Sequence, residues 1–444
     1  MTRSLLACLA ALALAGCGSW HYTINAPLEK HDPARGYRFE QLEASGNSDS
    51  LFIALTFSGG GMRASALAYG VLERLAAERV TWEGRSTRLL DEVDYINAVS
   101  GGSMTAAYYA LHRDGLFRDF HKRFFERNLQ DRLESRIVQF AAIPRLMSSR
   151  YGRIDMVQEF LDEMLYDGKT FADIPRRKPY VSISASDIGL GARFEFTQGM
   201  FDLLCSDLDK FPVSRAVAAS SAVPMVFSPV TLWNYAGSCA LPAFPQPPRA
   251  QDGLMVARQE QRVRELMSYL DRGKRPYIHL LDGGLADNIG IRALMETSAL
   301  LGGLDRVFKA AGVAPVKKLA IFMVNAETES DRSVDMTADV PTLSQVVRAL
   351  ADVPINRYSF ETEVIGRQAI LQWHKRMIDS GRPLDLYLVE VNIKEFGDPV
   401  ERQFLNVIPT TLQLPPETIE RIRRAGATLL DQSPEYRRLV DSLR

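Results

Sequence analysis

Several residue classes are scarce in this chain of 444 residues, and each scarcity excludes a class of protein. The four cysteines are too few for a disulfide scaffold, and no cysteine and histidine cluster has zinc-site spacing. Basic and acidic residues number 53 and 54, so the basic footprint of a nucleic-acid-binding protein is missing. After the N-terminal segment, no run of about 18 apolar residues predicts a membrane-spanning helix. We therefore expect a globular protein with no metal, no cofactor and no nucleic-acid partner.

The N-terminal segment differs from the rest of the sequence. A positive start precedes an almost wholly apolar stretch, 4–15, which is too short to span a bilayer. The stretch ends in Leu-Ala-Gly-Cys at 14–17, which resembles the lipobox of bacterial lipoproteins, where cleavage precedes a cysteine that carries diacylglycerol. We expect residues 1–16 to be a signal peptide and Cys17 to anchor an exported protein in the cell envelope. Gly18 favours the periplasmic face of an outer membrane; the alternative is a chance cysteine near an ordinary cleavage site.

Such export would leave Cys205 and Cys239 as the only cysteines beyond the anchor. In an oxidising compartment the two thiols could pair. Two buried free thiols are an equal alternative. Between the anchor and the first apolar run, residues 17–50 are polar and contain scattered proline and glycine, which indicates a linker.

Short apolar runs alternate with helical patterns along the remainder of the chain. The run at 51–57 is followed by a glycine triplet and a helical pattern over 64–77, and the run at 93–99 by Ser-Gly-Gly and a second helical pattern. This alternation predicts an α/β fold with a mainly parallel sheet, whose active site lies at the carboxyl ends of strands. Further strands are expected at 180–185, 277–281, 319–324 and 386–393.

Ser100 occupies a turn suited to a nucleophile. A serine on a tight turn between strand and helix exposes its hydroxyl above the sheet, and only small residues fit two positions to either side. Those positions are Ala98 and Gly102, so the segment nearly matches the G-x-S-x-G elbow, with alanine in place of the first glycine. The serine needs a neighbouring base to take its proton.

The glycine triplet can supply the electrostatic part of acyl transfer. Gly59, Gly60 and Gly61 can turn backbone N–H groups toward a developing oxyanion, and the helix that follows adds positive potential. Arg63 could hold an anionic head group or fix the loop through hydrogen bonds. A phosphate-binding loop is the rival interpretation, but no Gly-Lys-Ser/Thr completes it, and the spacing of a dinucleotide fingerprint is absent.

The candidate base is Asp282, which follows the expected strand 277–281 and precedes Gly283 and Gly284. A carboxylate at a strand terminus can reach a serine across the cleft, accept its proton and return it to the leaving alkoxide. An aspartate that merely caps the turn is the structural alternative. Because no histidine has a recognisable catalytic setting after Ser100, a Ser–Asp dyad is favoured. His374, within a helical pattern, would be needed for a Ser-Asp-His triad.

Four motifs together resemble the patatin-like phospholipase family: Gly-Gly-Gly-Met-Arg, Ser-Gly-Gly-Ser, Ala-Ser-Ser-Ala-Val-Pro and Asp-Gly-Gly, in that order. The resemblance covers about 51–295 and implies a three-layer α/β sandwich that hydrolyses lipid acyl esters. It assigns Ser100 as nucleophile and Asp282 as base, with an oxyanion hole formed by the glycine triplet and Gly101. Two small replacements depart from the pattern, Ala64 after the arginine and Ala98 before the elbow.

The resemblance also organises the rest of the chain. Residues 241–275, which contain a proline-rich loop and a helical pattern, are expected to form an insertion in the catalytic domain. Residues 296–444 are expected to form an α/β extension that packs on the catalytic domain. We expect a serine hydrolase acting on phospholipids or related lipids, attached to the membrane through Cys17; oligomeric state is not predicted. The alternatives are a non-catalytic lipid-binding lipoprotein and a Ser-Asp-His esterase.

Overall fold

The computed structural model describes residues 21–43, 46–127, 131, 135, 143–243, 253–310, 312–313, 315–329 and 333–444. The predicted signal peptide and Cys17 lie outside the described residues, as do residues 244–252 of the proline-rich loop. Within the described ranges, no helix combines the length and apolar character needed to cross a membrane.

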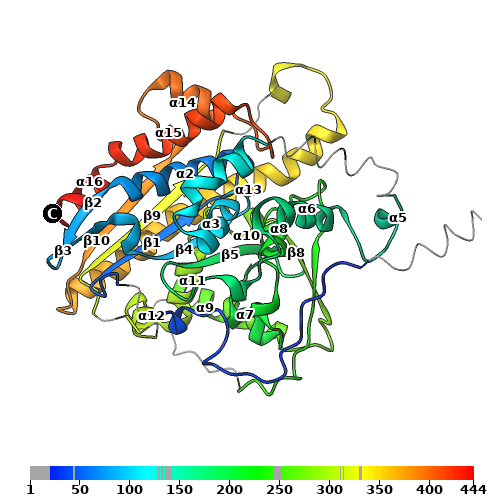
Figure 1. Ribbon diagram of the computed structural model, residues 1–444, viewed down its shortest axis with the longest axis horizontal. Coiled ribbons are helices and arrows are strands. Elements are labelled where there is room, and N and C mark those ends of the chain that lie inside the picture. The colour runs from blue at the N-terminus through cyan, green and yellow to red at the C-terminus, as the bar shows by residue number, and fades with distance from the viewer. Residues whose placement is uncertain are drawn as a thin grey trace, which may run out of the picture.

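A central sheet organises the chain (Figure 1). The strand order is β10-β9-β1-β4-β5-β8-β7, with β6 also paired to β5. The first five strands in this order are mutually parallel, whereas β6, β7 and β8 are joined by antiparallel pairing. The strands are β1 Leu51–Phe57, β4 Val93–Val99, β5 Tyr180–Asp187, β6 Ala192–Glu195, β7 Val230–Trp233, β8 Tyr277–Leu281, β9 Lys318–Asn325 and β10 Asp385–Asn392; a separate hairpin pairs β2 Arg79–Trp82 with β3 Arg85–Arg88.

Both faces of the sheet are covered by helices, which confirms the predicted three-layer architecture (Figure 1). Alternate residues of β1 point to opposite cores, because side chains alternate along a strand. Ile53 and Leu55 join the larger core, with α2 Gly61–Ala77, α3 Gly101–His112, α8 Val213–Ser220 and α15 Pro416–Gln432. Phe52 and Ala54 join a second core, with α11 Arg292–Leu301, α12 Leu304–Ala310 and α13 Leu343–Asp379.

The remaining α-helices are shorter or lie at the periphery. They are α5 Ile143–Leu146, α6 Arg153–Leu161, α7 Gln198–Leu203, α9 Gly253–Tyr269, α10 Gly284–Asp287, α14 Pro399–Asn406 and α16 Pro434–Asp441. The helix expected inside the insertion is therefore present as α9, and it packs against α11.

The C-terminal third completes the sheet itself. Strand β9 pairs with β1 along the whole of Leu51–Phe57, and β10 extends the sheet beyond β9. On the face of the sheet that carries the larger core, α15 packs closely on α2. A Cβ on Gly70 of α2 would lie 2.0 Å from the carbonyl oxygen of Arg423 on α15. The expected extension packed on the domain is thus continuous with the domain's sheet and core.

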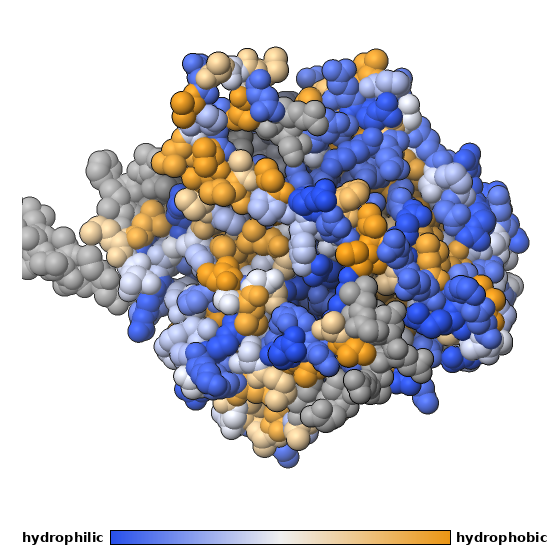
Figure 2. Space-filling model, turned by 180° about the vertical axis from the view of Figure 1, so that it is seen from behind, coloured by the Kyte–Doolittle hydropathy of each residue, from blue (hydrophilic) through white to orange (hydrophobic). Residues whose placement is uncertain are grey.

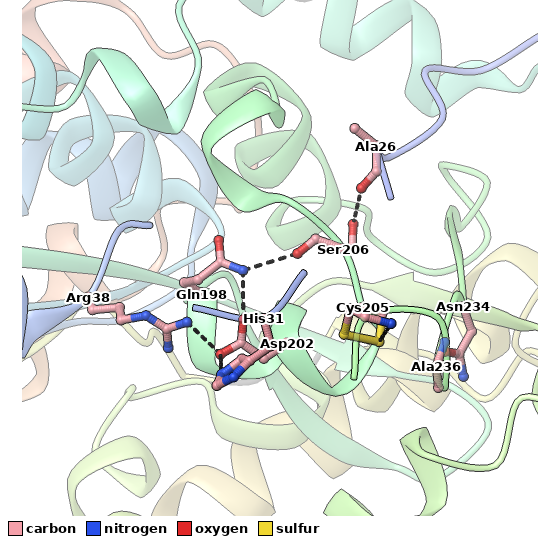
Figure 3. The surroundings of a disulfide bond; sticks show 10 residues. Ala26, His31, Arg38, Gln198, Asp202, Cys205, Ser206, Asn234 and Ala236 are labelled. Carbon is pink, nitrogen blue, oxygen red and sulfur yellow. Dashed lines mark hydrogen bonds and ion pairs between the residues drawn. A yellow bond between two sulfur atoms is a disulfide. The ribbon is translucent and has the colours of Figure 1, made fainter. Parts of the chain in front are cut away.

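Residues 21–43, expected to form part of a linker, are instead packed on the body of the protein. Tyr37 is fully buried, and Arg38 donates to Asp202 at 2.6 Å. Ser206 Oγ donates to the carbonyl of Ala26 at 2.9 Å (Figure 3). The linker prediction is wrong for this stretch because its aromatic and polar side chains find partners on several elements.

The segment that receives these N-terminal residues is itself cross-linked. Cys205 and Cys239 form a disulfide with Cα atoms 5.4 Å apart (Figure 3). The structure therefore selects the paired form of the two alternatives left open by the sequence. Both sulfur-bearing residues are buried, so the bond lies within the fold.

Candidate active site

Ser100 lies at the junction of β4 and α3 in a strained turn. Its backbone has φ 49° and ψ −124°, a combination that non-glycine residues adopt rarely. The turn packs tightly on the glycine loop, since a Cβ on Gly101 would lie 2.0 Å from the carbonyl oxygen of Gly61. A Cβ on Gly102 would lie 2.7 Å from the carbonyl oxygen of Ser58. Glycine at these positions, with buried Ala98 beneath, permits the contact that aims the serine above the sheet.

The Ser100 hydroxyl meets the carboxylate of Asp282. Ser100 Oγ donates to Asp282 Oδ2 at 2.8 Å, and both residues are 6% exposed. The other carboxylate oxygen, Oδ1, accepts the backbone N–H of Gly284 at 2.8 Å. The two side chains thus share a hydrogen bond although 182 positions separate them in the chain.

Strand direction explains how Asp282 arrives there. The sequence argument placed both residues at the carboxyl ends of parallel strands, but β8 runs antiparallel to β5. Strand β8 enters from beyond the end of β5 and stops after Leu281 pairs with Ser186. Gly283 then lies against Ser184, the residue of β5 that pairs with Val99, so Asp282 reaches the elbow. A Cβ on Gly283 would lie 2.3 Å from the Ser184 carbonyl oxygen, which explains the glycine.

Burial tunes the Asp282 carboxyl. Removal from water raises its pKa to about 6, partly offset by the hydrogen bonds from Gly284 and Ser100. The carboxylate is therefore ionised at neutral pH yet more basic than an exposed aspartate. A general base needs this combination because proton transfer is most effective when its pKa approaches the working pH.

Two helix N-termini meet beside Ser100. Helix α2 begins at Gly61 and α3 at Gly101. The N–H groups of Gly60, Gly61 and Gly101 donate to no acceptor in the described part of the chain. Free N–H groups at helix N-termini attract negative charge. The expected oxyanion hole included Gly59, and the structure corrects this, because the Gly59 N–H already donates to the carbonyl of Asn288 at 3.0 Å.

The comparisons with known proteins bear directly on this arrangement. Residues 55–295 match the family model described as patatin-like phospholipase, which is more than half of the chain. The chain belongs to the patatin-like phospholipase family. This confirms the resemblance seen in the sequence motifs. No curated protein matches the chain.

Solved structures to which the chain is similar include human GIVD cytosolic phospholipase A2, at 12% identity and a TM-score of 0.43. That alignment covers 89% of this chain but only 62% of the human protein, so the chain spans less than two thirds of its length. VipD from Legionella pneumophila aligns at 13% identity, with coverage of 97% and 73% respectively and a TM-score of 0.31.

Arg63 of this patatin-like protein fixes the glycine loop to the C-terminal third. Its guanidinium donates to the carbonyl of Ala326 at 2.7 Å, to the carbonyl of Ile408, and to Thr410 Oγ1 at 3.2 Å. The side chain is 2% exposed, and burial lowers its pKa to about 10. Of the two roles expected for Arg63, the structure shows support of the glycine loop. The expectation that Arg63 binds an anionic head group is corrected, because its guanidinium is buried and already hydrogen-bonded to the C-terminal third.

Sequence reasoning missed a residue that supports the elbow. Ser220, at the end of α8, accepts the Ser100 backbone N–H at 2.7 Å and donates to the Ser184 carbonyl at 2.6 Å. Ser220 therefore links the turn that carries Ser100 to helix α8 and strand β5. Ser220 belongs to the Ala-Ser-Ser-Ala-Val-Pro motif, whose small residues indicated close packing but not this hydrogen bond.

His374 is not brought to the dyad of this patatin-like protein. It lies on α13, where its Nε2 is 2.8 Å from the carbonyl oxygen of Leu384. In the described ranges, no histidine hydrogen-bonds to Ser100 or Asp282, and the same ranges contain no acidic, histidine or cysteine cluster placed to hold a metal ion. Within the described ranges, the side-chain partner of the Ser100 hydroxyl is therefore a carboxylate and not an imidazole.

Proposed function

We propose that the protein is a serine acyl hydrolase that cleaves ester bonds of phospholipids or related lipids through Ser100 and Asp282. The observation that carries the proposal is the 2.8 Å hydrogen bond between the serine hydroxyl and a buried carboxylate, beside free backbone N–H groups. Family membership supports a lipid ester as the substrate class. The buried base and helix N-termini support a reaction in which negative charge develops on a carbonyl oxygen.

The reaction proceeds in two halves. Asp282 takes the hydroxyl proton as Ser100 Oγ bonds to the ester carbonyl carbon, and the N–H groups of Gly60, Gly61 and Gly101 stabilise the oxyanion. Collapse breaks the bond to the alcohol, which leaves with the proton from Asp282, and an acyl-serine remains. Water then attacks the acyl carbon while Asp282 takes one of its protons; the bond between the acyl carbon and Ser100 Oγ breaks, Asp282 returns the proton to Oγ, and the carboxylic acid is released.

A serine-reactive fluorophosphonate probe tests this proposal. We expect the purified chain to be labelled at Ser100, with full loss of labelling in Ser100→Ala and unchanged labelling in Ser86→Ala, which removes an exposed serine on β3. Products from mixed phospholipids, measured by mass spectrometry, identify the ester that is cut. A folded wild-type chain without labelling or lipid turnover would favour the non-catalytic lipid-binding alternative.

We also propose that the protein is exported and anchored by an acylated Cys17, which would place it at the lipid surface of the cell envelope. Exposed apolar side chains on one helix support the binding of the protein to a lipid surface. Figure 2 shows hydrophobic patches on the face of the molecule seen from behind. The N-terminal half of α13 exposes large apolar side chains. These include Leu343 at 80% exposure, Leu350 at 71% and Phe360 at 57%.

Metabolic labelling tests the anchor. In a bacterial host we expect an alkyne palmitate analogue to label the full chain and the membrane fraction to retain it. Cys17→Ser should abolish both, because serine cannot carry the thioether-linked lipid, while Cys8→Ser should change neither. Equal labelling of the Cys17→Ser chain would contradict the anchor without bearing on the dyad.

A further inference from the structure

A cavity lies away from the serine, among α11, α12 and the C-terminal half of α13. Its volume is about 510 Å³, within the range of small-molecule sites. Neither the dyad nor the glycine loop lines it. Its walls belong to the core on the other face of the sheet from α2 and α3, so it is separate from the candidate active site.

Arginine side chains are the most numerous polar groups of this cavity. Four arginines line it, against a single carboxylate, Asp305, which pairs with Arg382 at 3.2 Å; the arginines are Arg258, Arg306, Arg376 and Arg382. The side chains of Arg376 and Arg382 are exposed at the rim. Guanidinium groups bind carboxylate and phosphate oxygens through paired N–H donors. The lining charge therefore favours an anion.

A buried hydrogen-bond donor is part of the same cavity lining. Trp373 is 4% exposed, and its indole Nε1 has no hydrogen-bond partner in the described part of the chain. This nitrogen lies 3.7 Å from the position a Cβ would take on Gly303, which also lines the cavity. An indole N–H can only donate, and buried donors are normally paired. The unpaired donor indicates where an acceptor atom of a ligand belongs.

The remaining wall is hydrocarbon. Leu294, Leu304 and Ile370 are buried there, and Met295 and Met377 are half-buried. Methionine side chains adapt to ligands of varied shape. A ligand that satisfies both parts has an anionic head and an apolar tail.

We propose that this cavity binds a single-chain amphiphilic anion, either a fatty acid or a phosphate monoester such as a lysophosphatidic acid. The oxygen acceptors lie among the arginines and Trp373 Nε1, and the chain lies against the apolar wall. This site goes beyond the proposed hydrolysis, because ligand binding there requires no turnover at Ser100. The two ligand sources share a tail and differ in the head group.

Binding is measured by isothermal titration calorimetry on the full chain carrying Ser100→Ala, which cannot consume an added ester. Decanoate and decyl phosphate, below their micelle concentrations, present the two head groups on the same tail, and 1-decanol is the uncharged comparison. We expect decanol to bind at least about tenfold more weakly than the better anion. The preferred anion identifies the source.

Pocket variants locate the binding. Because Arg376 and Arg382 are exposed, Arg376→Gln with Arg382→Gln should preserve the fold and weaken anion binding by about tenfold. Trp373→Phe, which keeps a ring but removes the donor, should weaken it by about threefold. Arg424→Gln, on α15 and outside the cavity, is the matched control and should bind as its parent does.

Two results would overturn the site: affinity unchanged in the double arginine variant, which would place the ligand elsewhere, or decanol binding as tightly as both anions. Wild-type hydrolysis is measured separately. Lost anion binding with intact hydrolysis overturns only this inference, whereas lost hydrolysis with intact binding overturns only the proposed function.

Discussion

Ser100→Ala and Asp282→Asn are each expected to lower kcat for lipid ester hydrolysis by about 10⁴-fold or more, because nucleophile and base act as one unit. Alanine removes the atom that forms the acyl bond, and asparagine removes the proton acceptor while keeping the shape. Hydrolysis of a labelled phospholipid by purified protein measures the loss. The exposed controls Ser86→Ala and Asp335→Asn should retain wild-type rates. Substantial activity in either dyad variant would refute the mechanism.

The pH profile offers a second readout of the same pair. The pKa of Asp282 is raised to about 6, and the base works only when ionised. We therefore expect kcat/KM to rise with pH and level off above about 6, falling about tenfold per unit below it. A profile that stays flat down to pH 4 would exclude a buried carboxylate as the base.

The same burial predicts that Asp282→Asn stabilises the protein. A carboxyl whose pKa is raised on folding binds its proton more tightly in the folded state, so stability falls as pH rises from about 4 to about 6 and stays reduced above it. Asparagine avoids burying the charge and should raise the free energy of unfolding at pH 7 by on the order of 2 kcal/mol. Chemical denaturation at pH 4 and pH 7 should show the advantage only at the higher pH.

Removal of residues 296–444 is expected to abolish folding, even though the remaining chain contains the whole family match. Truncation strips β9 from β1, whose seven residues are all buried, and leaves the sheet with an apolar edge. It also removes α15 from α2 and all three hydrogen-bond partners of Arg63.

Solubility, circular dichroism and fluorophosphonate labelling measure the effect of truncation. The point variant Arg63→Met is the companion experiment. It should keep secondary structure but lose most labelling, because the glycine loop loses its attachment to the C-terminal third. A truncated chain that unfolds cooperatively and labels at Ser100 would show that residues 51–295 are self-sufficient.

The sequence predicted those elements of the fold that depend on local patterns, namely short apolar runs and glycine-rich turns. Apolar runs such as 51–57 and 93–99 lie at their predicted positions as β1 and β4, and the Ser-Gly-Gly turn lies between strand and helix. Strand direction was not predictable at β8, because a five-residue run carries no signal for its partner. The short strands β6 and β7 also escaped prediction, and only the segment around His374 of the long helix α13 was predicted to be helical.

The candidate site was predictable to a similar degree. Two glycine turns at strand ends made Ser100 and Asp282 candidates, and the family resemblance assigned them as a pair. The partners of Arg63 did not, since Ile408 and Thr410 lie in a loop without a motif. The N–H of Gly59 and the hydroxyl of Ser220 are likewise assigned only by tertiary contacts that local sequence does not encode.

The distance along the chain between Ser100 and Asp282 has a consequence for the cell that makes the protein. Contacts between distant segments form late, because a long loop must close first. An emerging chain carries the serine long before β8 delivers its partner, so the nascent polypeptide holds no complete pair. Under the proposed function, the chain therefore cannot cleave lipid esters during its synthesis and becomes competent only after β8 has joined the sheet.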